Sequence, residues 1–139
     1  MKAKGTEMQS TINLKQIIVA VVLTVSAVPV MAGWMKYSES DESDQYIDLS
    51  SIRKSGDLRK VWQMWDYRIR GKYGQSSQTL RTEFNCKDET TRLLVVNGYE
   101  EPLANGKVLS SVTHNNDQRF DIPPDTAGAR ALELVCSKK

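Results

Sequence analysis

Cysteine thiols, with a histidine as their partner, could carry out redox or nucleophilic chemistry in this chain. The 139 residues contain two cysteines, Cys86 and Cys136, and one histidine, His114. The cysteines form no Cys-x-x-Cys motif, and His114 stands beside two asparagines, where an exposed loop residue is expected rather than a ligand. The sequence offers none of the clustered groups that an enzyme site needs, so we expect a protein without catalytic activity.

Two charged segments could bind ions. The acidic, serine-rich stretch 38–44 alternates carboxylates, but it lacks the glycine and the closing glutamate of an EF-hand loop. Arg68, Arg70 and Lys72 would share one side of a continuing strand and could hold a sulfate or phosphate group. For both segments we favour solvent-exposed charges. We therefore expect no metal ion and no cofactor.

The N-terminal segment has the pattern of a secretory signal peptide. Lys15 precedes the apolar run 16–28, which is followed by Pro29 and by the small residue Ala32. This pattern predicts a signal peptide over 1–32, cut between Ala32 and Gly33. A permanent membrane anchor is the alternative, because the segment carries no charge from Gln16 to Met35. Met1 and Met8 are both possible starts, and a lipoprotein is not expected because no cysteine lies near the cleavage site.

Removing 32 of the 139 residues leaves 107, enough for one compact domain over 33–139. The signal segment holds three lysines and Glu7, so the exported part has 16 basic and 16 acidic residues. This balance gives no support for nucleic-acid binding. In an oxidising compartment we expect Cys86 and Cys136 to form a disulfide. Closing a loop of about 50 residues would stabilise the fold by roughly 4 kcal/mol.

Alternating patterns predict the elements that position these residues. We expect strands near 34–37, 45–48, 58–68, 80–86, 91–99 and 107–113, one helical turn at 49–53, and a helix over 127–136. The start of that helix is predicted by Pro123 and Pro124, followed by Asp125 or Thr126 as the cap. Its apolar face consists of Gly128, Ala131, Leu132 and Val135. Cys86 points inward in its strand, so a bridge to Cys136 would hold the helix on the sheet.

The strand 58–68 is bulky and apolar on both sides. One side carries Leu58, Lys60, Trp62, Met64 and Asp66, and the other carries Arg59, Val61, Gln63, Trp65 and Tyr67. With one helix to cover one face, we expect a second copy of the chain to cover the other. We place Val61, Trp65 and Tyr67 on this partner face, because aromatic residues favour interfaces. The alternative is that strand twist and long loops cover that face within one chain.

Nine short motifs follow one another along the chain: Tyr46-Ile47-Asp48, Ser51-Ile52-Arg53, Val61-Trp62, Asp66-Tyr67, Ser76-Ser77, Glu83-Phe84-Asn85-Cys86, Gly106-Lys107-Val108, Ile122-Pro123-Pro124 and Val135-Cys136. Their order resembles that of the surface-adhesin protein E family of Gram-negative bacteria. The resemblance implies an α+β fold, with a single antiparallel sheet of about six strands and one C-terminal helix packed on one face. It also implies a homodimer and adhesion to host extracellular-matrix or serum proteins.

The sequence therefore predicts an exported, non-catalytic binding protein, located in the periplasm, secreted or displayed at the surface. After cleavage no segment is expected to span a membrane. The alternative is a structural or accessory protein of the periplasmic envelope that has no host ligand.

Overall fold

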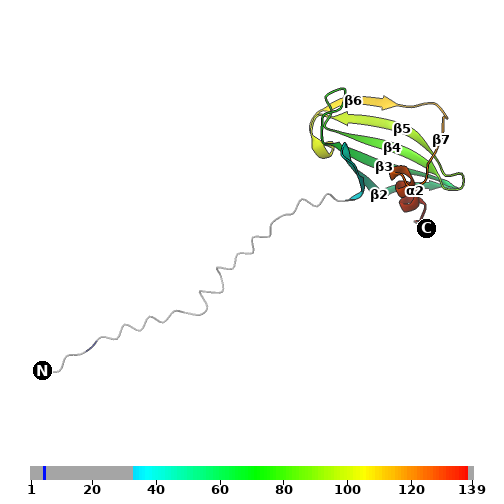
Figure 1. Ribbon diagram of the computed structural model, residues 1–139, viewed down its shortest axis with the longest axis horizontal. Helices are drawn as coiled ribbons and strands as arrows, with labels where there is room; N and C mark the ends of the chain where they lie inside the picture. The colour runs from blue at the N-terminus through cyan, green and yellow to red at the C-terminus, as the bar shows by residue number, and fades with distance from the viewer. Residues whose placement is uncertain (1–4, 6–32, 138–139) are drawn as a thin grey trace. The chain divides into compact units, whose positions relative to one another are not determined.

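The computed structural model describes Gly5 and residues 33–137 of the chain. The expected signal peptide therefore lies outside the described residues, apart from Gly5, and cleavage before Gly33 stays a prediction. In the described part, one open antiparallel sheet carries a single long helix near the C-terminus (Figure 1), which confirms the expected α+β class. No helix among these residues is long and apolar enough to cross a membrane.

The sheet has the strand order β1-β2-β3-β4-β5-β6, and a short strand β7 also pairs with β5. The elements are β1 (Trp34–Glu39), β2 (Ser43–Ser55), β3 (Leu58–Tyr67), β4 (Ser77–Asn85), β5 (Thr90–Tyr99), the 3-10 turn η2 (Pro102–Ala104), β6 (Val108–Thr113), β7 (Phe120–Asp121) and α2 (Ala127–Ser137). Each strand from β1 to β6 pairs in antiparallel fashion with its neighbour in sequence.

The helical turn expected at 49–53 is wrong, because β2 continues through it as a strand. The register of β2 against β3 shifts between Asp48 and Arg53, where side chains supply hydrogen bonds. The Asp48 carboxylate accepts the Ser50 N–H at 2.9 Å, and the Ser51 hydroxyl accepts the Trp62 N–H at 2.9 Å. Short polar side chains thus accept main-chain N–H groups at a bulge in the strand. The same hydrogen bonds compete with those of a helix.

Helix α2 begins at Ala127, the position predicted from the two prolines and the capping residue. The Thr126 hydroxyl accepts the N–H of Ala129 at 3.2 Å, so Thr126 is the residue that caps the helix. Ala131 and Val135 are fully buried against the sheet, in one core with Ile47, Val61 and Phe84.

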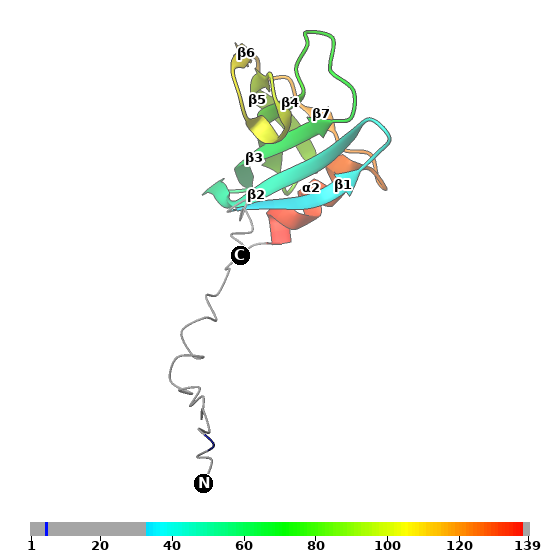
Figure 2. The ribbon, with the colours of Figure 1, turned by 90° about the vertical axis from the view of Figure 1, so that its left-hand side faces the viewer.

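A disulfide joins the last turn of α2 to the end of β4. The bond links Cys86 and Cys136, whose Cα atoms are 5.7 Å apart, and confirms the expected bridge. It holds α2 to the sheet, along β1 and β2 in the view of Figure 2.

Candidate interaction surface

On the sheet face under α2, burial is greatest in the middle strands and lowest at β6. The register places Ile47, Gln63, Leu80, Val96 and Val112 side by side on β2 to β6, all on this face. Ile47 is fully buried and Leu80 is 6 % exposed, whereas Val112 is 50 % exposed. Helix α2 lies over β1, β2 and β3 and leaves the part of the face beyond β4 open.

A mostly apolar hollow of about 490 Å³ lies on this face beside the start of α2, and residues of β1 to β5 line it. Phe120 of β7 forms part of its wall, lies opposite Thr91 of β5 and is 55 % exposed. The described residues that line the hollow include no charged side chain. We call Leu80, Leu93, Val96, Val112 and Phe120 the open half-face.

A smaller hollow of about 280 Å³ adjoins the open half-face beyond the end of β6. It is lined by Leu93, His114, Asn116, Gln118 and Phe120. The expectation for His114 is therefore only partly met, since its side chain is half-buried at this hollow rather than fully exposed.

The opposite face of the sheet is closed by the chain itself. Met64 is fully buried on that face, and the η2 turn packs on β3 and β4 beside it. The Asp66 carboxylate accepts the Leu103 N–H at 2.7 Å, and the Ser77 hydroxyl accepts the Ala104 N–H at 2.9 Å. Both η2 residues have positive φ, 57° and 58°, a strained conformation that these hydrogen bonds hold in place.

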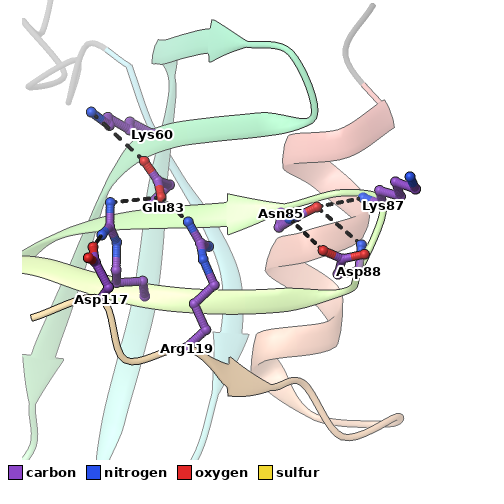
Figure 3. A network of polar contacts seen from close by, with 8 residues as sticks. Lys60, Glu83, Asn85, Lys87, Asp88, Asp117 and Arg119 are labelled. Atoms are coloured by element: carbon purple, nitrogen blue, oxygen red, sulfur yellow. Dashed lines mark hydrogen bonds and ion pairs between the residues drawn. The ribbon is translucent and has the colours of Figure 1, made fainter.

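A second part of the same face holds a buried carboxylate, Glu83, which three basic side chains contact (Figure 3). Glu83 is 2 % exposed and forms ion pairs with Arg92 at 3.0 Å, with Lys60 at 3.8 Å and with Arg119. Arg92 also contacts Asp117, so two residues of the segment between β6 and β7 are tied to the middle of the sheet. These contacts join β3, β4 and β5 to the segment that precedes β7.

The partner face expected from the sequence has to be corrected. Val61 is 1 % exposed and lies in the core under α2, so its assignment to a partner face is wrong. Trp65 follows on the same side of β3, half-buried at the large hollow, and Tyr67 is half-buried at the end of the strand. Burial raises the pKa of the Tyr67 hydroxyl, and more strongly buried Tyr37 has a raised pKa for the same reason. Contact of Trp65 or Tyr67 with another chain stays a prediction.

The remaining chemical candidates are engaged in local contacts. Asp44 of the acidic segment is paired with Lys36 at 3.2 Å and with Arg68 at 2.8 Å. Arg70 donates to the carbonyl oxygens of Gly74 and Glu100, at 2.8 and 3.1 Å. Both described cysteines are in the disulfide, and no group of three potential ligands gathers within residues 33–137.

Sequence reasoning missed the open half-face because its two most exposed members are hard to detect. Phe120 lies in a strand of two residues, too short to show an alternating pattern. Val112 lies in a predicted strand, but its exposure depends on where α2 ends across the sheet, which no local pattern encodes.

Comparisons with known proteins agree with this architecture. The sequence model of a family described as surface-adhesin protein E matches residues 34–137. No curated protein matches the chain. A solved structure of protein E from Haemophilus influenzae, in its selenomethionine form, matches with a TM-score of 0.60 and 17 % identity, over 78 % of this chain and 89 % of that one. Protein E from non-typeable Haemophilus influenzae matches with a TM-score of 0.54 and 16 % identity, over 78 % of each chain. At this identity the likeness shows a shared fold.

Proposed function

Because the chain belongs to the surface-adhesin protein E family, we propose that it is an exported, non-catalytic protein that binds other proteins through its open half-face. The observation that carries the proposal is the exposure of Phe120 at a large hollow with an uncharged lining, together with the exposure of Val112 on the same face of the sheet. Soluble monomers seldom leave a contiguous apolar surface uncovered, and interface centres are poor in charge and rich in aromatic residues.

The chemistry of the described residues supports binding rather than catalysis. The two cysteines are bonded to each other, so they supply no thiolate nucleophile. His114 stands beside Asn116 and Gln118 at its hollow, among groups that would not activate it as a base. The ligand class that we propose is a host extracellular-matrix or serum protein, and the functional form is a homodimer.

Export follows from the pattern at the N-terminus, and the protein carries no lipid because no cysteine lies near the cleavage site. We expect the intact mass of the product from a Gram-negative host to correspond to a chain that begins at Gly33. Labelling of intact cells, or recovery from the culture medium, is the result that agrees with adhesion. Strict retention in the periplasm would favour an envelope accessory role, and a product that keeps residues 1–32 in the membrane would contradict cleavage.

Phe120→Asp should weaken protein binding by at least about tenfold, because a charge would replace an aromatic residue at the centre of the surface. The measurement is binding of the purified variant to a panel of immobilised extracellular-matrix and serum proteins. Tyr73→Asp is the matched control, since Tyr73 is also aromatic and is 72 % exposed, but it lies on the β3–β4 loop.

Thermal unfolding checks that both variants keep the fold. If Phe120→Asp binds as well as the unchanged protein, or if Tyr73→Asp loses as much binding, the open half-face is not the binding surface. If the unchanged protein binds no member of the panel, the adhesive function itself is contradicted.

A further inference from the structure

The two edges of the sheet differ in how well they are protected against pairing with another strand. At β1 the register against β2 shifts between Lys36 and Ser38, and Lys36 forms ion pairs with Glu39 and Asp44. Bulges and charged side chains are the usual devices that block an edge. Strand β6 has the sequence Val-Leu-Ser-Ser-Val-Thr, without a charge or a proline, and five of its six residues are exposed. Its register against β5 also shifts, next to Leu109, but the residues from Ser110 to Thr113 pair regularly with β5.

The hydrogen bond that follows β6 fixes which main-chain groups face outward. The N–H of His114 donates to the carbonyl of Leu94 in β5 at 2.8 Å. Because N–H and C=O groups of successive strand residues point to opposite sides, those of Val112 also point toward β5. Those of Ser111 and Thr113 then point away from the sheet, where no described strand pairs with them.

We propose that β6 pairs in antiparallel fashion with β6 of a second copy of this chain, about a two-fold axis at Val112. This inference rests on the homodimer of the proposed function and assigns its surface. In this register Ser111 of each copy lies opposite Thr113 of the other, and each such pair exchanges both of its main-chain hydrogen bonds. The outward-facing N–H and C=O groups of Ser111 and Thr113 are then all hydrogen-bonded.

A second copy fits this edge better than a strand of a different protein for two reasons. The two-fold axis places Val112, which is half exposed, against its own copy, so apolar surface is buried symmetrically. Serine opposite threonine is a favourable pair across strands, and the absence of charge on β6 means that no like charges meet.

The pairing also has a consequence for binding. Val112 belongs to the open half-face, so the axis joins the open half-faces of two copies into one surface. A ligand protein would then meet both copies at once.

Cysteine cross-linking of the exported protein tests this register. At a non-hydrogen-bonded pair the Cα atoms lie about 4.5 Å apart, within the roughly 4.4–6.8 Å that a disulfide spans. Val112→Cys should therefore form a dimer linked by a disulfide under mild oxidation. Ser110→Cys is the matched control on the same face of β6. In this register it lies four residues from its own copy, about 13 Å along the strand, too far to be bridged.

We expect at least about ten times more cross-linked dimer from Val112→Cys than from Ser110→Cys, in line with these distance limits. Peptide mapping should find the Cys86–Cys136 bond unchanged in both variants. Equal cross-linking of the two variants would overturn the register. If light scattering shows a dimer but Val112→Cys does not cross-link, the dimer uses another surface and this inference falls alone. If the unchanged protein stays monomeric at high concentration, the homodimer of the proposed function falls with it.

Discussion

Cys136→Ser should lower the free energy of unfolding of a protein consisting of residues 33–139 by about 2–5 kcal/mol. The bond closes a loop between residues 50 positions apart, and its loss frees the unfolded chain to sample more conformations. It also releases the last turn of α2, whose Val135 is fully buried in the core. Urea unfolding, followed by fluorescence of the tryptophans, measures the change.

Cys136→Ser leaves a free thiol at Cys86. The double variant Cys86→Ser with Cys136→Ser has no free thiol, and it should be destabilised to a similar extent if loss of the bond is the cause. Ser137→Ala changes the neighbouring exposed position and should leave the stability within about 0.5 kcal/mol. A loss of less than about 1 kcal/mol in the double variant would mean that core packing alone holds α2 in place.

Glu83→Ala should lower the free energy of unfolding by about 3–5 kcal/mol, because it removes the buried carboxylate that three partly buried cations share. Glu83 contacts Lys60, Arg92 and Arg119, and its side chain is 2 % exposed. Without it the two guanidinium groups would stay close together in a poorly solvated place. Chemical unfolding of the exported protein at neutral pH is the measurement.

Glu133→Ala is the matched control for Glu83→Ala. Glu133 pairs with Arg130 at 2.8 Å on the outside of α2, where its side chain is 67 % exposed. Exposed ion pairs contribute only about 0–1 kcal/mol. A similar loss of stability in the two variants would show that the buried Glu83 network contributes no more than an exposed ion pair. The network would then not hold the segment between β6 and β7 to the sheet.

Much of the fold could be predicted because local patterns encode it. Alternation in Leu80–Cys86 marks a strand, and prolines followed by Thr126 mark the start of α2. The bridge could be predicted as well, because export and the inward position of Cys86 both favour it. These features depend on residues close together in the sequence.

The faces of β3 could not be assigned in the same way. Trp62 and Trp65 lie on opposite sides, so both faces look apolar and the pattern does not say which of them meets α2. The assignment of Val61 to a partner face is wrong for this reason, because its side of β3 meets α2. The second face is covered by Leu103 of η2 and by Arg119, which follow β3 by more than 30 positions, and such long-range cover leaves no local signal.

Amide hydrogen exchange of residues 110–113, measured on the exported protein at low and high concentrations, tests most directly whether the molecule meets its partners at the β6 side of the sheet. Ser110 and Val112 donate toward β5 and should be protected at every concentration, which gives an internal control. The amides of Ser111 and Thr113 point outward, and their protection should rise with concentration as β6 pairs with its copy. If their exchange is equally fast at all concentrations, or if new protection appears instead around η2 and Met64, the partner surface lies elsewhere and the account is contradicted.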